Sequence, residues 1–118
     1  MRTIEMFEKV TGSGKSLEEL GINSTMYWAY RNSKEAGCDT LNFDDVIWEK
    51  DIEAIVTACK EYGIERITIS SSFSGLLETL AKFEELGGKV DGLTKVTSKY
   101  TDFVTREKRV EPAVVVKF

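Results

Sequence analysis

The stretch from Ile64 to Val96 constrains the fold most, because strand, turn, helix and strand patterns follow one another in about 33 residues, the size of a β-α-β crossover. Residues 64–70 are short and rich in β-branched side chains, which favours a buried strand. Apolar positions recur every three or four residues across residues 73–86, which predicts a helix ended by Gly87 and Gly88. Residues 89–97 then form a second strand. Two strands joined by a helix of this length are expected to run parallel, with a right-handed connection.

The flanking residues extend this unit to a single domain over residues 1–118. Helical patterns at residues 25–36 and 48–62 predict a helical N-terminal half, with a short strand between them. The β-prone run at residues 113–118 follows a polar turn, so it is expected to return antiparallel to the strand at residues 89–97. The sequence therefore predicts an α/β fold with a small mixed sheet.

Two apolar helix stripes are expected to pack on the strand at residues 64–70. Together they would form the core of the domain. The stripe before the strand consists of Trp48, Ile52, Ile55 and Cys59, and the stripe after it consists of Phe73, Leu76, Leu77 and Leu80.

The absence of histidine removes several classes of catalysis. Ser-His-Asp and Cys-His nucleophiles, imidazole acid–base chemistry and His-containing zinc sites all require that residue. Cys38 and Cys59 stand 21 residues apart without a CxxC motif, so we expect two reduced structural thiols. We expect no catalytic residues, no cofactor and no metal, and a non-enzymatic protein is favoured over an enzyme.

Two local patterns imitate binding motifs. The segment Gly12–Ser16 resembles a phosphate-binding loop, but Lys9 stands where that loop requires glycine. Ser16 and Glu19 instead fit a capping box that opens a short helix. An acidic cluster spans residues 44–53, but on a helix most of its carboxylates would spread over the exposed face instead of converging on a cation.

The serine-rich turn after the first strand of the crossover is the candidate ligand site. Helix N-termini attract anions, and ligands of open α/β sheets bind beyond the carboxyl ends of parallel strands. Capping of the helix by the serine hydroxyls is the competing explanation and the favoured one. The candidate residues are Ser70, Ser71, Ser72, Ser74 and Gly75.

Aromatic residues and the terminal strand supply a candidate interaction surface. Tyr27 and Tyr30 share one helix face, and Trp28 points about 100° away from Tyr27. Burial on two sides is favoured over exposure for such a helix. The strand that contains Val115 is apolar on both faces, and an unpaired apolar edge strand is a template for another chain. We expect one of these surfaces to contact a partner protein, most simply a second copy in a homodimer. The alternative is that the N-terminal helices cover the strand within one chain.

Charge and hydropathy limit the other partners. The chain carries 16 basic and 20 acidic residues without a concentrated basic face, so nucleic acid is not an expected partner. No apolar run approaches the roughly 20 residues that span a bilayer, and the first residues lack a signal-peptide core. A cytoplasmic location is expected, with no membrane contact.

Three stretches resemble a family of small uncharacterised proteins from gut anaerobic bacteria. They are residues 21–31, 46–56 and 67–93, so the resemblance covers most of the chain. It implies a bacterial, cytoplasmic protein of unknown function and transfers no site residues. Two hypotheses follow from the sequence as a whole. The first is a protein-interaction or regulatory adaptor module, and the second is a small-ligand, nucleotide or anion-binding domain that uses the Ser70–Gly75 turn.

Overall fold

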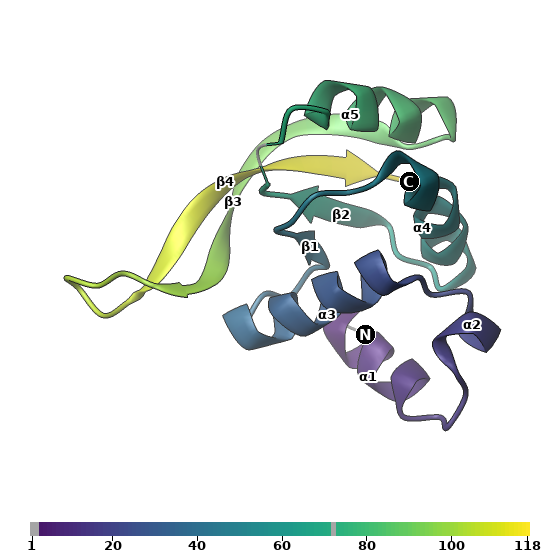
Figure 1. The fold of residues 1–118 in the computed structure, drawn as a ribbon, viewed down its shortest axis with the longest axis horizontal. Helices are drawn as coiled ribbons and strands as arrows, with labels where there is room; N and C mark the ends of the chain where they lie inside the picture. Colours follow the sequence, from purple (N-terminus) through teal and green to yellow (C-terminus); the bar gives the residue numbers. More distant parts are fainter. Residues whose placement is uncertain (1–2, 72) are drawn as a thin grey trace.

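A computed structural model describes residues 3–71 and 73–118, which form five helices and four strands (Figure 1). Among these residues no helix is long and apolar enough to cross a bilayer. The elements are α1 (Thr3–Thr11), α2 (Leu17–Leu20), α3 (Ser24–Ala36), β1 (Asn42–Phe43), α4 (Glu49–Glu61), β2 (Arg66–Ile69), α5 (Leu76–Glu85), β3 (Lys89–Thr101) and β4 (Lys108–Lys117).

The four strands form one mixed sheet in the order β1-β2-β4-β3. β1 and β2 are parallel, and β4 is antiparallel to both β2 and β3. The predicted α/β class, the mixed sheet and the antiparallel terminal strand are therefore confirmed. β2 and β3 run in the same direction, as expected for a β-α-β unit, but they do not pair because β4 lies between them.

The position of β4 contradicts the expectation that the terminal strand is an unpaired edge. The terminal strand is not an unpaired edge, because Val114 to Lys117 pair with β2 and the same strand pairs with β3 on its other side. Val115 lies opposite Thr68 and is only 7% exposed. Pro112 precedes the point where β2 joins, so its missing amide donor is tolerated there. The sheet edges are β1 and β3.

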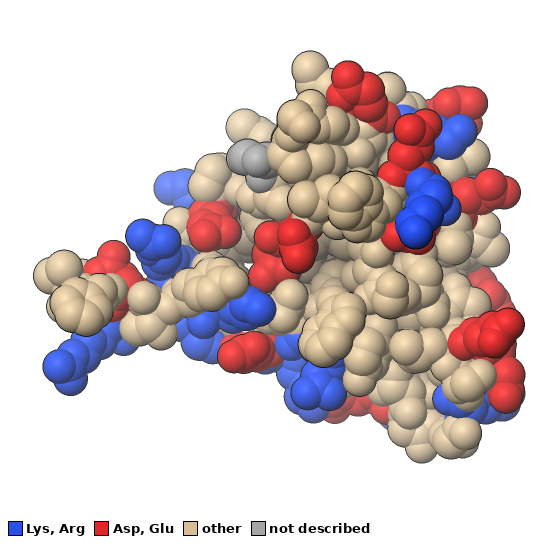
Figure 2. Space-filling view, in the orientation of Figure 1, with Lys and Arg blue, Asp and Glu red and all other residues tan. Residues whose placement is uncertain are grey.

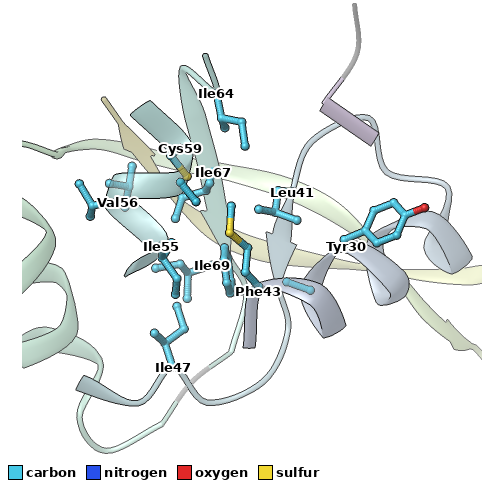
Figure 3. Packing of buried hydrophobic residues seen from close by; sticks show 14 of the residues in the cluster. Tyr30, Leu41, Phe43, Ile47, Ile55, Val56, Cys59, Ile64, Ile67 and Ile69 are labelled. Carbon is cyan, nitrogen blue, oxygen red and sulfur yellow. The ribbon is translucent and has the colours of Figure 1, made fainter. Parts of the chain in front are cut away.

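Helices cover both faces of the central strands. Ile67, Thr68 and Ile69 are consecutive and all buried, and successive strand residues point to opposite faces, so both faces of β2 are covered. α5 contacts α4 and β3, while α3 contacts β1 and β3 and is backed by α1 (Figure 1). Figure 3 shows Ile55 and Cys59 of α4 directed at β2.

The expected core stripes are correct in part. Ile52, Ile55 and Cys59 are fully buried, but Trp48 is 61% exposed because it precedes the first turn of α4. Phe73, Leu76 and Leu80 are half-buried against the core, but Leu77 is 78% exposed. The fully buried residues of α5 are Thr79 and Phe83. The expected helix at residues 73–86 begins three residues later, at Leu76, and that shorter helix presents Phe83 to the sheet and Leu77 to solvent.

Local capping explains the boundaries of the early helices. The Ser16 hydroxyl accepts a hydrogen bond from the Glu19 amide at 3.2 Å, and Gly21 ends α2 in the left-handed conformation. The predicted capping role of Ser16 is therefore confirmed. Asn23 caps α3 in the same way through the Met26 amide at 2.8 Å.

A side chain closes the outer edge of β1. Leu41 and Phe43 use their carbonyls to pair with β2, so the amide and carbonyl of Asn42 face away from the sheet. The hydroxyl of Ser33 on α3 accepts from the Asn42 amide at 2.9 Å and donates to its carbonyl at 3.2 Å. This edge therefore has no free backbone groups at Asn42, and it does not offer a template for another strand.

Candidate functional site

The hairpin of β3 and β4 projects beyond the helices (Figure 1). We call residues 94–110, which form its outer part, the arm. Four large apolar side chains are exposed on it, and Phe103 at the tip is 97% exposed. The others are Tyr100, Val104 and Val110. Apolar side chains gathered on one projecting element are typical of a contact surface.

The tip of the arm is a hydrogen-bonded turn. The carboxylate of Asp102 accepts from the amides of Val104 at 2.8 Å and Thr105 at 3.1 Å. These bonds favour the ionised form and hold the pKa of Asp102 below its usual range. Arg106 adopts a positive φ of 62° within the turn, and its amide donates to the Asp102 carbonyl at 2.9 Å. Asp102 therefore fixes the backbone that presents Phe103.

The arm is tied to the C-terminal end of α3 and to the residue Cys38 just after it. The Cys38 thiol donates to the Thr97 carbonyl at 3.1 Å, and the Lys99 ammonium donates to the Asn32 side chain at 3.1 Å. The Lys108 ammonium donates to the Glu35 carbonyl. These contacts give the arm a fixed direction relative to the body.

The arm also differs from the body in charge. It carries five basic residues against two acidic ones, whereas the whole chain has 16 basic and 20 acidic residues. Figure 2 shows mostly Lys and Arg among the charged side chains on the projecting arm, and more Asp and Glu on the body. The basic residues are Lys95, Lys99, Arg106, Lys108 and Arg109.

The four predicted interaction residues occupy different environments. Tyr30 is buried and stacks on Phe7 with ring centroids 5.4 Å apart. Val115 is buried at the centre of the sheet, and Tyr27 is half-buried beside Trp28. Only Trp28 is well exposed, at 60%. The favoured expectation of burial is therefore correct for Tyr30 and wrong for Trp28.

Ser70 and Ser71 do not cap α5. Gly75 precedes the helix without a side-chain cap, so the favoured capping explanation is wrong for these two serines. The Ser70 hydroxyl accepts from the Asn42 side chain at 3.0 Å, and the Ser71 hydroxyl donates to the Asp45 carbonyl at 2.8 Å. Ser70 therefore bonds to β1 itself, and Ser71 bonds to the segment that follows β1. Ser72 lies outside the described residues.

A cavity of about 470 Å³ lies beside Ser74 and Gly75. Its lining includes the carboxylates of Glu49 and Glu78, and no described Lys or Arg. The uncapped amides of α5 would attract an anion, but two carboxylates oppose it. Anion binding at this turn stays a prediction that the surrounding charge disfavours.

A second cleft, of about 340 Å³, opens where β1 ends. Both tryptophans of the chain line it, one from α3 and one from the residue before α4. The pair was not predicted from the sequence, because Trp48 fitted an apolar helix stripe. The acidic residues that precede Trp48 in the sequence were the feature that could have indicated its exposure. The charged residues of the lining are Asp44, Asp45, Lys50 and Asp51.

The two cysteines are poor nucleophiles. Burial raises the pKa of Cys59 to about 12, and burial also raises the pKa of the half-buried Cys38. We expect iodoacetamide at pH 8 to leave Cys59 unmodified in the folded protein and to modify Cys38 slowly. Intact-mass measurement over time checks this, with both thiols alkylated in urea as the control. Native labelling of Cys59 at the rate of the unfolded chain would contradict its burial.

Comparisons with known proteins give a family but no activity. No curated protein and no solved structure matches the chain significantly. A family model described as a domain of unknown function, DUF7698, matches residues 25–118, which include α3 apart from its first residue, the four strands of the sheet and the arm. The expected kinship with an uncharacterised family is thereby confirmed, while the bacterial source stays a prediction. The chain belongs to the DUF7698 family.

Proposed function

We propose that this chain is a non-enzymatic interaction module that associates with a second copy of itself through the arm. The observation that carries the proposal is the exposed apolar tip, Phe103 and Val104, on a turn whose backbone is fixed by Asp102. Because the backbone of this turn is already fixed, its apolar side chains lose little conformational freedom on binding. Most of the free energy gained by burying them therefore contributes to affinity.

Charge favours a second copy as the partner. The arm is basic and the remainder of the chain is acidic. An arm laid on the body of another copy would bring opposite charges together, which steers association and fixes its orientation. Exchange of arms between two copies would satisfy the twofold symmetry that most homodimers have.

The arm variant Phe103→Ser with Val104→Ser tests the proposal. We expect the wild type to sediment as a dimer at tens of micromolar and this variant as a monomer, because the apolar contact is removed. Since the arm and body attract through exposed charges, 0.5 M NaCl should weaken the wild-type dimer at least severalfold.

Leu77→Ser is the matched control. Leu77 is also an exposed apolar residue, but it lies on α5. Its removal should leave the dimer intact. A dimer that survives the arm variant, or that is lost equally in the control, would place the interface elsewhere.

Ligand binding at the Ser70–Gly75 turn is the weaker proposal. Its support is the uncapped start of α5 next to a cavity. The carboxylates in the lining of that cavity count against phosphate and nucleotide. We therefore place the functional weight on the arm.

A further inference from the structure

The cleft at the end of β1 combines two exposed indoles with carboxylates. Trp28 and Trp48 come from different elements and are 60% and 61% exposed, although tryptophan is highly buried on average. Ala29 and Phe43 also line the cleft. Its position, beyond the carboxyl end of a strand in a parallel pair, is where ligands of α/β sheets bind.

Three aspartates give the cleft a negative charge. A neutral group donates a hydrogen bond to one carboxylate oxygen of each aspartate. The side-chain amide of Asn32 donates to Asp44 at 3.0 Å, and the hydroxyl of Thr25 donates to Asp51 at 2.8 Å. The Val46 amide binds Asp45 at 2.7 Å. None of the three forms an ion pair with a described Lys or Arg, and Lys50 is the one basic residue among the described residues of the lining. The carboxylates are therefore oriented but not neutralised.

The charge distribution selects the class of ligand. Within residues 3–71 and 73–118 no three acidic, cysteine or histidine side chains converge closely enough to hold a metal ion. Carboxylates that do not converge suit an organic cation, which is larger than a metal ion. Guanidinium groups stack on aromatic faces and bind carboxylates, and indole is the most favourable ring for a cation. A volume of about 340 Å³ is at the small end of ligand sites.

We propose that the cleft between Trp28 and Trp48 binds an organic cation, an alkylguanidinium or alkylammonium group. The cation lies against the indole rings, and Asp44 and Asp51 supply the opposing charge. Such a group occurs both in small free amines or guanidines and in the Arg or Lys side chains of proteins. This proposal rests on the cleft alone and is independent of the arm.

Intrinsic fluorescence reads this cleft directly, because both tryptophans of the chain line it. Titration with butylguanidinium at low salt should change the emission saturably, with a Kd below about 1 mM. Butylurea, which has a similar shape without charge, should bind at least tenfold more weakly. The same titration in 0.5 M NaCl should weaken butylguanidinium binding as well, because the attraction is electrostatic. This salt comparison needs no variant and keeps the test decisive if a variant does not fold.

The double variant Asp44→Asn with Asp51→Asn removes two of the three negative charges and keeps the shape of the cleft. It should bind butylguanidinium at least tenfold more weakly, while the control Glu84→Gln on α5 should bind like the wild type. A Gly-Arg-Gly peptide, acetylated and amidated at its ends, shows where the natural cation comes from. If the peptide binds more tightly than butylguanidinium, the ligand is a protein side chain. If it binds equally or more weakly, the ligand is a small free molecule. The proposal is overturned by no saturable change up to about 10 mM, by equal binding of butylurea, or by unchanged affinity in the double variant.

Discussion

Phe83→Ala is expected to lower the free energy of unfolding by about 3–5 kcal/mol, the usual cost of truncating a buried phenylalanine. Phe83 is fully buried, and its ring lies 6.2 Å from that of Phe118. Gly88 lies against the Phe83 carbonyl and against the side chains of Val116 and Phe118. The surroundings cannot collapse into the space left behind without moving β4, the strand that joins both halves of the sheet. A loss of this size is a large part of the 5–15 kcal/mol that stabilises a typical domain.

Urea unfolding followed by circular dichroism measures this effect. Leu77→Ala on the same helix is the control, because Leu77 is 78% exposed and surface changes stay within about 0.5 kcal/mol. Leu80→Ala should fall between the two, since Leu80 is half-buried. A loss below about 1 kcal/mol for Phe83→Ala would show that α5 does not pack on the sheet through this residue.

Ser33→Ala is expected to have the second largest effect. It leaves the amide and the carbonyl of Asn42 buried without their partner, and each unsatisfied buried group costs about 1–3 kcal/mol. Asn42 is itself tied into the sheet by the Thr68 hydroxyl at 2.8 Å. Loss of Ser33 should therefore loosen β1 from α3 while its pairing with β2 remains.

Two measurements distinguish this effect from a general loss of stability. Hydrogen exchange at the Asn42 amide should accelerate more than exchange at the paired Thr68 amide. The exposed Ser74→Ala should change neither exchange nor the unfolding midpoint. An unfolding free energy for Ser33→Ala within about 0.5 kcal/mol of wild type would mean that water replaces the hydroxyl.

The helices and strands were predictable where local signals agreed. Asn23 and Gly37 mark both ends of α3, and the β-branched run at residues 64–70 gave β2 with a shorter length, Arg66–Ile69. The order of the strands was not predictable, because insertion of β4 between β2 and β3 depends on pairing between distant residues. The terminal strand was therefore correct in type and direction, but its expected edge position was wrong.

The candidate sites depended even more on tertiary structure. The serines of the turn were expected to cap α5, yet Ser70 and Ser71 bond to the segment around β1, which is distant in sequence. Trp48 fitted an apolar stripe by spacing, and only the start of α4 at Glu49 leaves it in solvent. The arm projects because β3 and β4 extend beyond the helices. The sequence has no strong local pattern that marks where β3 ends or where β4 begins.

Sedimentation velocity of the unmodified chain tests the central claim most directly. Across roughly 1–100 µM, an ordinary range for self-association, association through the arm predicts a concentration-dependent shift from about 13.3 kDa, the mass of one chain, to twice that mass. The shift should diminish in 0.5 M NaCl. A single species with the mass of one chain at every concentration would contradict self-association and leave the arm to a different protein.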